Sequence, residues 1–139
     1  MNPIGKLFIA GHVALYRATG GKLGGTIQGL SVILLTTRGR KSGAERTVPV
    51  CPYREGDKIY VMASMGGQPQ HPAWYFNIET NPKVEVQVGS DRFRARAKVL
   101  PPEERALVWP KVTSAMPNFA EYQTKTSRVI PVVELVCET

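Results

Sequence analysis

The stretch Leu30–Arg54 reads LSVILLTTRGRKSGAERTVPVCPYR, and it decides the fold of this chain. Its first eight residues form a continuous apolar, β-branched run, which predicts a buried strand. The segment RTVPVCPYR follows the turn GRKSG and predicts the antiparallel partner of that strand. Because proline cannot donate to a strand ladder, Pro49 and Pro52 place this partner at a sheet edge or at a bulge.

The rest of the chain alternates further predicted strands with two helical intervals. Residues 55–57 form a tight turn, and residues 83–99 alternate polar and apolar positions, which predicts a hairpin with one solvent-facing side. Prolines bound a helix within 71–82 and divide 101–126 into two short helices. The remaining predicted strands are 58–64, 83–88, 92–99 and 128–137. About six strands with short helices inserted indicate an α+β fold built on an antiparallel sheet or barrel.

Apolar positions at helical spacing predict an amphipathic helix at the N-terminus: Ile4, Leu7, Phe8, Gly11 and Leu15. The glycine-rich segment 20–25 breaks this helix and is typical of a flexible connector. We therefore expect two parts, the N-terminal helix with its connector over residues 1–25 and one compact domain over residues 26–139.

Composition limits the functional classes. The chain has 139 residues, a net charge of +7 and two cysteines, Cys51 and Cys137, both in apolar runs. These cysteines predict buried free thiols, and together with His12 and His71 they are too scattered to predict a metal site. No apolar run long enough to span a bilayer and no signal-peptide pattern occur, so we expect a cytoplasmic protein. The positive charge favours an acidic partner, such as nucleic acid, an anionic membrane surface or a phosphorylated or carboxylated ligand.

The turn GRKSG is either a solvated basic hairpin loop or an anion site. Gly39 and Gly43 allow a tight turn and close approach of a ligand to the backbone. Arg40 and Lys41 stand at the turn and Arg46 lies on the returning strand, where a guanidinium and an ammonium could bind phosphate oxygens. The residues of the turn leave both readings open.

A basic stripe lies on the strand RFRARAK, at Arg92, Arg94, Arg96 and Lys98. Such a stripe could follow a phosphate backbone. However, Phe93 points to the opposite face and cannot stack on bases, and Glu85 and Gln87 on the neighbouring strand can pair with the stripe. A solvated strand face is the favoured interpretation, and we expect no nucleic-acid partner.

The passage MASMGGQPQHPAWYFNIETNP joins a strand through a glycine-rich loop to a helix. Small residues such as Ser64 let a flat ring lie against the backbone, whereas Trp74 and Phe76 are equally typical of core anchors. No G-x-S-x-G elbow, paired carboxylates or triad occurs in the sequence. If the chain is an enzyme, a bound cofactor therefore carries the chemistry.

Four blocks, LLTTRGRKSGAERTVPV, VMASMGGQPQHPAWYFNIETNPKVEVQV, PPEERALVWPKV and EYQTKTSRVIPVVEL, together resemble the deazaflavin-dependent nitroreductase family. The resemblance runs from about Leu30 to the C-terminus. It implies an antiparallel split β-barrel like that of proteins that bind flavin mononucleotide (FMN), and the 8-hydroxy-5-deazaflavin coenzyme F420. This coenzyme carries a phosphodiester and a polyglutamate tail, so an acidic ligand would meet the basic turn.

The resemblance also implies site residues. Arg40, Lys41, Ser42 and Arg46 match the phosphate contacts, and Ser64 and Tyr122 are the candidate catalytic residues, which would orient the acceptor and stabilise or protonate the product. The other implied cofactor-binding residues are Thr47, Val48, Pro49, Val50, Cys51, Met62, Ala63, Ser64, Met65, Ala73, Trp74 and Asn77. The implied substrate pocket consists of Met116, Phe119 and Tyr122. Met116, Phe119 and Lys125 stand where tyrosines and a tryptophan crowd the substrate mouth of the best-known member, and Met65 stands where lysine is common.

The implied reaction is hydride transfer from C5 of the reduced deazaflavin to an electron-poor acceptor: a quinone, an enone or enoate, or a nitro compound. An F420-reducing dehydrogenase would be linked to this protein through the coenzyme, and we expect a monomer. Two alternatives remain, an FMN-binding split-barrel oxidoreductase and a non-enzymatic F420 carrier or nucleic-acid-binding module. The N-terminal helix could dock on the barrel or lie weakly at the inner face of the cell membrane.

Overall fold

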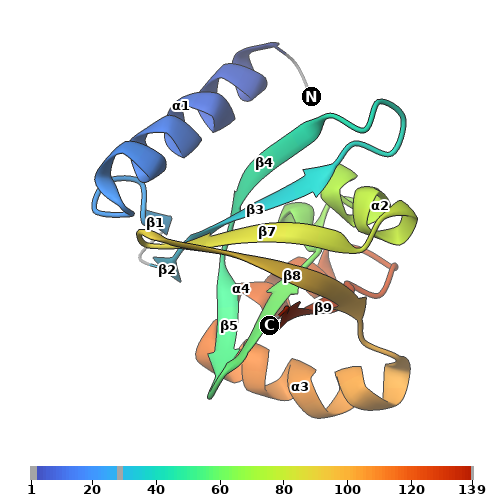
Figure 1. Ribbon diagram of the computed structural model, residues 1–139. Coiled ribbons are helices and arrows are strands. Elements are labelled where there is room, and N and C mark those ends of the chain that lie inside the picture. Colours follow the sequence, from blue (N-terminus) through green and yellow to red (C-terminus); the bar gives the residue numbers. More distant parts are fainter. Residues whose placement is uncertain (1–2, 28–29, 139) are drawn as a thin grey trace.

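The structure is a computed structural model that describes residues 3–27 and 30–138. Nine strands, four α-helices and a 3-10 turn follow one another in this described part of the chain (Figure 1). In chain order they are α1 Pro3–Thr19, β1 Thr26–Ile27, β2 Leu30–Ser31, β3 Ile33–Arg38, β4 Glu45–Val50, β5 Pro52–Glu55, β6 Lys58–Met62, η1 Met65–Gly67, α2 Ala73–Thr80, β7 Lys83–Val88, β8 Asp91–Val99, α3 Pro102–Ala115, α4 Asn118–Thr124 and β9 Val132–Cys137.

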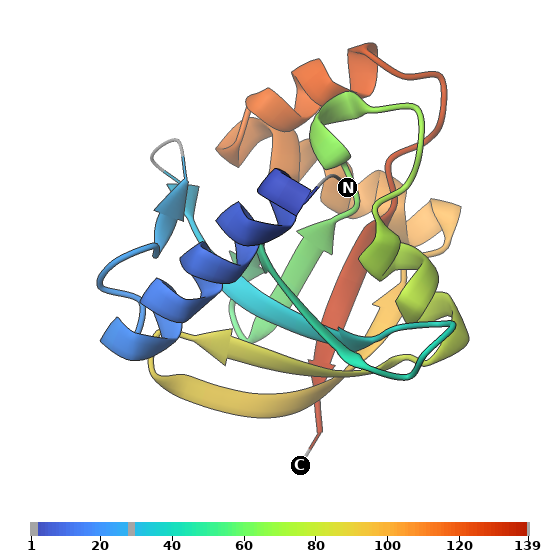
Figure 2. The same ribbon diagram turned by 90° about the horizontal axis from the view of Figure 1, so that it is seen from above.

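Strands β3 to β9 form one antiparallel sheet in the order β4-β3-β7-β8-β9-β6-β5. Its two edge strands, β4 and β5, are joined by Cys51 alone. A flat sheet of this width would hold its edges about 29 Å apart, whereas Val50 and Pro52 can be separated by at most about 7 Å. The sheet must therefore curl until its edges meet, and Figure 2 shows this curled half-barrel from above.

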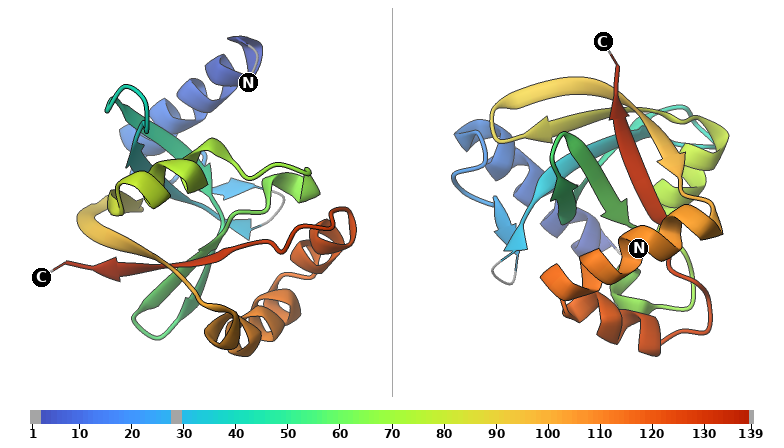
Figure 3. Two further views of the ribbon diagram at one scale, coloured as in Figure 1. Left: turned by 90° about the vertical axis from the view of Figure 1, so that its right-hand side faces the viewer. Right: turned by 90° about the horizontal axis from the view of Figure 1, so that it is seen from below.

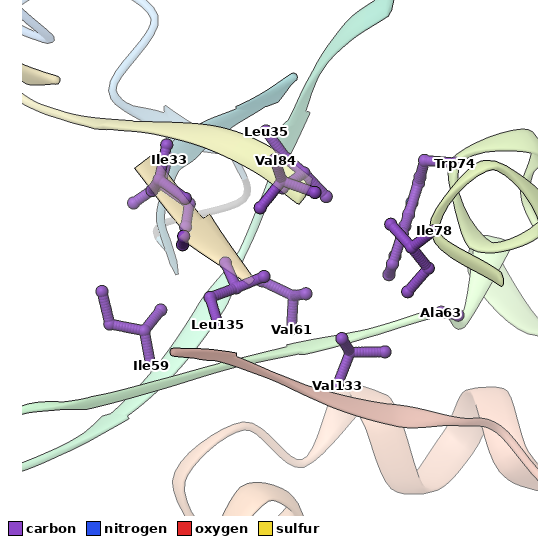
Figure 4. Packing of buried hydrophobic residues seen from close by; sticks show 12 residues of the cluster. Ile33, Leu35, Ile59, Val61, Ala63, Trp74, Ile78, Val84, Val133 and Leu135 are labelled. Carbon is purple, nitrogen blue, oxygen red and sulfur yellow. The ribbon is translucent and has the colours of Figure 1, made fainter. Parts of the chain in front are cut away.

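The inside of the curled sheet is filled by alternate residues of its strands. Ile59, Val61 and Ala63 point inward along β6 and just beyond it, and Val133 and Leu135 do so on β9. Figure 4 shows these side chains with Trp74 and Ile78, which reach in from α2 and close one end of the barrel.

The outward residues of the same strands are covered by helices. Tyr60 and Met62 of β6 pack with buried residues of α3 and α4 such as Val112 and Phe119. Val13 and Tyr16 of α1 pack on Leu34 of β3 and on Val32. Figure 3 shows α1 and α3 on opposite sides of the barrel. Strands covered on both sides read as continuous apolar runs, which explains the pattern of LSVILLTT.

The observed elements confirm the predicted α+β split barrel with two differences. The segment RTVPVCPYR forms two strands at opposite edges, because the chain leaves the β3 ladder at Cys51, and the main sheet gains a strand beyond the expected six. The run LSVILLTT is also divided, since Leu30–Ser31 pairs with β1 and the main strand begins at Ile33.

The predicted N-terminal helix is present, but its buried face differs from the expected one. Leu15 is 51% exposed, whereas Tyr16 is 1% exposed. Ile4, Leu7 and Phe8 have side chains outside the described set. The connector is a defined turn, in which Leu23 N donates to Thr19 Oγ1 at 2.9 Å and Gly21 N to Tyr16 O at 2.9 Å. The division at residue 25 stays a prediction.

Candidate functional site

The turn between β3 and β4 is built by its own hydrogen bonds. Gly39 N donates to Ala44 O at 2.8 Å, and Gly43 N donates to Gly39 O at 2.7 Å. Gly43 has a φ of +72°, a conformation that favours glycine. Ser42 Oγ accepts from Ala44 N at 3.1 Å, which leaves its hydroxyl proton free to donate outward. Glycine at both predicted positions thus serves the turn, although only Gly43 of the two needs a positive φ.

Asn77 of α2 fixes this turn to the barrel. Its side chain is 6% exposed, with Oδ1 accepting from Arg40 N at 3.1 Å and Nδ2 donating to Thr37 Oγ1 at 3.0 Å. The Arg40 guanidinium lies 4.8 Å above the ring of Phe76, also on α2. Helix α2 therefore holds both the backbone and the charged end of Arg40.

A first cavity of about 830 Å³ opens beside this turn. Its walls come from the turn with β4, from α2 and from α1: Ile9, Ala10, Val13, Ala14, Arg17, Gly39, Arg40, Lys41, Ser42, Glu45, Arg46, Thr47, Val48, Ala73, Trp74 and Asn77. Four cationic side chains line it against one carboxylate, that of Glu45, which pairs with Arg38 at 3.4 Å. The cavity is therefore suited to an anionic ligand with an apolar part.

A second, smaller cavity of about 310 Å³ lies further along β4. It is lined by Leu30, Pro49, Val50, Cys51, Met62, Ser64, Met65, Gly66, Pro72, Trp74, Asn118, Phe119 and Tyr122. Trp74 lines both cavities, and β4 passes from one to the other, since Arg46, Thr47 and Val48 face the first and Pro49 and Val50 the second. The two cavities are thus adjacent along a single strand.

Polar groups of the second cavity are few and oriented. Tyr122 Oη lies 3.3 Å from Asn118 Nδ2, from which it accepts, so its own proton can be donated to a ligand. The Phe119 and Tyr122 rings stand edge to face at 5.5 Å and 90°. Burial raises the pKa of the Cys51 thiol, which keeps it protonated and weakly nucleophilic.

Most of the predicted site residues meet in these cavities. The first contains Arg40, Lys41, Ser42, Arg46, Thr47, Val48, Ala73, Trp74 and Asn77, and the second contains Pro49, Val50, Cys51, Met62, Ser64, Met65, Phe119 and Tyr122. Ala63 and Met116 do not belong to either lining set. Ala63 is fully buried inside the barrel. Met116 lies between α3 and α4 and packs in the cluster that contains Val112 and Phe119. The roles of all these residues stay predictions.

Two further features were missed from the sequence. One wall of the first cavity comes from α1, where apolar residues and Arg17 face the ligand space, and no motif marks them. The other is Arg128, which donates to Ala63 O at 3.0 Å, to Ser64 O at 2.7 Å and to Gln68 O at 2.9 Å. Its Nη1 also lies 2.9 Å from His71 Nδ1. An arginine in the segment between α4 and β9 carries no sequence signal for such a role.

The basic stripe of β8 has partners on the protein itself. Arg92 pairs with Glu85, and Lys98 pairs with Glu104 at 3.3 Å. The predicted pairing with Gln87 is wrong, because that side chain is 5% exposed and donates to Gly89 O at 2.9 Å. The stripe is consistent with a solvated strand face.

A curled antiparallel barrel with a cation-lined cavity next to an apolar one defines a protein that binds an acidic, ring-bearing ligand. The chain belongs to the F420H(2)-dependent quinone reductase family, whose model matches residues 9–138. This confirms the resemblance seen in the sequence and extends it through most of α1. The chain is thus an oxidoreductase of a family whose cofactor is coenzyme F420.

Relatives and solved structures agree with this membership. The chain is 41% identical over 128 residues to an F420H(2)-dependent quinone reductase of Mycobacterium tuberculosis H37Rv, covering 89% of this chain and 86% of that protein. A structure described as the F420-H2 dependent reductase FDR-A is 46% identical, with a TM-score of 0.68 over 75% of this chain and 92% of its own. Another, described as a domain-swapped dimer, is 37% identical, with a TM-score of 0.70 over 96% and 99%.

An FAD-binding protein from Mesorhizobium loti, 17% identical with a TM-score of 0.58 over 78% of this chain and 79% of its own, shares the fold alone.

The donor set of the first cavity fits an acidic coenzyme, since four cations and the Ser42 hydroxyl surround a space with apolar walls. Among the described residues no helix is long and apolar enough to cross a membrane.

Proposed function

We propose that this chain binds coenzyme F420 along β4 and uses its reduced form to reduce a small quinone-type acceptor in the second cavity. The observation that carries this proposal is the passage of β4 from the cation-lined cavity to the apolar one, with Trp74 common to both. An acidic tail at one end and a flat, uncharged part of the ring system at the other match this gradient of charge.

In this arrangement the phosphodiester meets Arg40, Lys41, Ser42 and Arg46. The arginines supply forked donors and Lys41 a point charge. Lys41 and Arg46 are exposed and able to adjust to the ligand, whereas α2 holds Arg40 in place. The ring system follows Thr47 to Cys51 and reaches the loop after β6. Pro49 suits this wall, because β4 is an edge strand and loses no ladder partner there.

When bound in its reduced form, the coenzyme supplies a hydride to an electron-poor acceptor. The chain's share is to place the acceptor and to stabilise the oxygen on which negative charge develops. Tyr122 Oη is held by Asn118 with its proton free, so it can donate to that oxygen. Ser64 is 9% exposed at the wall of the same cavity and can supply a second hydroxyl.

The acceptor class follows from the second cavity. Its lining is uncharged and largely apolar, which suits a flat quinone head group, such as a benzoquinone or naphthoquinone, stacked against the ring system of the coenzyme. Enones and enoates fit the same donors and come second. Nitro compounds come last, since Met65 stands where the resemblance implies a lysine and Phe119 stands where it implies a tyrosine or a tryptophan.

Further aspects of function are part of this proposal. We expect a cytoplasmic protein that exchanges coenzyme with an F420-reducing dehydrogenase and makes no nucleic-acid complex. We keep the monomer as the working state, although a solved structure 37% identical to this chain is described as a domain-swapped dimer. Sedimentation at several concentrations decides between these states.

The test is a fluorescence titration of the purified protein with oxidised F420, run beside FMN. Saturable binding of F420 in the micromolar range or tighter, with weak binding of FMN, is the expected result. The variant Lys41→Ala with Arg46→Ala should abolish it, whereas Arg94→Ala with Arg96→Ala, which removes the same charge from exposed positions on β8, should not. Preferential FMN binding, or loss of binding in the control alone, would overturn the proposal.

A further inference from the structure

Helix α1 is fixed on the barrel by one buried tyrosine. Tyr16 is 1% exposed, and its hydroxyl donates to Val32 O at 3.0 Å and accepts from Gly89 N at 2.8 Å. The first contact lies directly before β3 and the second in the turn between β7 and β8, so one side chain links three segments. The position of α1 along β4 follows from this anchor.

The neighbouring residue, Arg17, lies on the wall of the first cavity. Its Nη2 donates to Thr47 Oγ1 at 3.4 Å, and that hydroxyl is in turn 2.7 Å from Thr36 Oγ1. Arg17 thus lines the same cavity as the GRKSG turn, on a different element from Arg40, Lys41 and Arg46. A cation on α1 can contact an anionic ligand from a wall that neither the turn nor β4 forms.

The positive charge of Arg17 is not paired with a carboxylate in the described part of the chain. Among the described residues no carboxylate lies within salt-bridge distance of it, whereas Arg38, Arg92, Lys98 and Lys111 each have one. The side chain is exposed and makes a single long hydrogen bond, so it can turn toward a ligand at little cost. The rest of the α1 wall, with Ile9, Ala10, Val13 and Ala14, is apolar.

We propose that Arg17 is a further anion-binding residue of the coenzyme cavity, and that Tyr16 is the positioning residue that aims it by fixing α1. The ligand group is an anionic oxygen of the coenzyme's tail, either the phosphodiester or a glutamate carboxylate. This inference rests on the proposed placement of the coenzyme in the first cavity. It makes α1 part of the ligand site instead of a separate appendage.

The first experiment measures fluorescence-detected Kd values for Arg17→Ala with three ligands. These are complete F420, the coenzyme with its phosphate but without glutamates, and the dephosphorylated deazaflavin riboside. Arg17→Ala should weaken complete F420 about tenfold, as the loss of one charge-assisted contact does, and leave the riboside within about twofold. Arg96→Ala, which removes an exposed arginine on β8, is the matched control and should leave the Kd values of all three ligands unchanged.

The glutamate-free coenzyme tells which oxygen Arg17 contacts. Weakening of this ligand assigns Arg17 to the phosphodiester, and weakening of complete F420 alone assigns it to the glutamate tail; either outcome supports the inference. Equal weakening of all three ligands, riboside included, would overturn it, because Arg17 would then act through the fold.

A second experiment tests the role of Tyr16 as a positioning residue. Tyr16→Phe removes the hydroxyl contacts to Val32 O and Gly89 N, so amide exchange in α1 should rise and Kd for complete F420 should increase. In an Arg17→Ala background the same change should have little further effect. Equal effects in both backgrounds would overturn the positioning role, since Tyr16 would then act without Arg17.

The outcomes separate this inference from the proposed function. If the wild-type protein does not bind F420, the function itself fails. If it binds and Lys41→Ala with Arg46→Ala abolishes binding while Arg17→Ala has no effect, the inference fails alone.

Discussion

The guanidinium of Arg128 donates a hydrogen bond of 2.7 Å to the carbonyl oxygen of Ser64, a residue 64 positions earlier in the chain. Further donations to Ala63 O at 3.0 Å and Gln68 O at 2.9 Å make the arginine a clamp on the loop that follows β6. This loop carries Met65 and Gly66 into the wall of the second cavity. The wall of the second cavity is therefore held by a residue in the segment that leads into β9.

Arg128→Lys should impair turnover more than coenzyme binding. A lysine replaces a planar fork with one ammonium and cannot serve all these carbonyls, so Ser64 loses its fixed position. We expect kcat with a short-chain quinone to fall at least tenfold while the Kd of F420 changes less than threefold. Unpaired carbonyls should also cost roughly 2 kcal/mol of stability, or about 5 °C in Tm.

The matched control for that change is Arg94→Lys, at an exposed position on β8. It should leave kcat, Kd and Tm unaltered. A proportional loss of coenzyme binding and kcat in Arg128→Lys would show that the clamp supports the whole barrel instead of the acceptor side.

His71 should make stability depend on pH. Burial, and then the charge of Arg128, lower the pKa of His71 below its ordinary value of 6.5. The folded protein therefore binds fewer protons here than the unfolded chain, so this stabilisation is complete above pH 6.5 and is lost as pH falls through the folded pKa. In thermal melts between pH 8 and 5, His71→Gln should show a smaller fall in Tm than the wild type. Identical slopes would exclude this role of His71.

Asn77→Ala should loosen the anion turn. The change leaves Arg40 N and Thr37 Oγ1 without the amide that now joins them, inside a site where Asn77 is 6% exposed. We expect a loss of roughly 2 kcal/mol in unfolding free energy from these unpaired groups. The Kd of F420 should rise about tenfold, because the backbone at Arg40 is no longer held. Glu79→Ala, exposed on the same helix, is the control; if it weakens binding equally, the effect is one of α2 as a whole.

The sequence predicted local structure well because strand and turn signals lie in neighbouring residues. The run Ile33–Arg38, the hairpin of β7 and β8 and the proline-bounded helix α2 all follow from such patterns. By contrast, the separation of β4 from β5 at Cys51 depends on the closure of the whole sheet. Proline signals indicated an edge there but could not show that the chain changes edges.

Most residues that the resemblance implied line the two cavities, because they cluster in short motifs on β4, β6 and α2. Their roles stay predictions. The missing parts come from single residues that act at a distance, Arg17 on α1 and Arg128 before β9, whose partners are a threonine hydroxyl and backbone carbonyls. Backbone partners leave no trace in side-chain patterns. For α1, the apolar spacing pointed to Leu15, yet the buried anchor is Tyr16, whose hydroxyl bonds favour its burial.

Gly67→Ala should alter the acceptor side selectively. Gly67 has a φ of +81°, and a Cβ there would lie 2.7 Å from Tyr122 O and 2.9 Å from Lys125 Cβ. Because a backbone oxygen cannot move aside cheaply, the 3-10 turn and α4 must separate, which displaces Met65 and Tyr122 together. We expect the KM for a quinone to rise at least tenfold, with the Kd of F420 within about threefold.

The neighbouring glycine provides the control for this change. Gly66 has a φ of +63°, but a Cβ there meets nothing within 4 Å, so Gly66→Ala adds backbone strain of about 1 kcal/mol without a clash. If both variants raise KM equally, the packing of Gly67 on α4 is not the cause, because strain in the loop or a methyl group added at the cavity wall would suffice. If Gly67→Ala alone raises KM, the close packing of the 3-10 turn on α4 shapes the acceptor cavity. The short distance between an added Cβ at Gly67 and Tyr122 O predicts this second outcome.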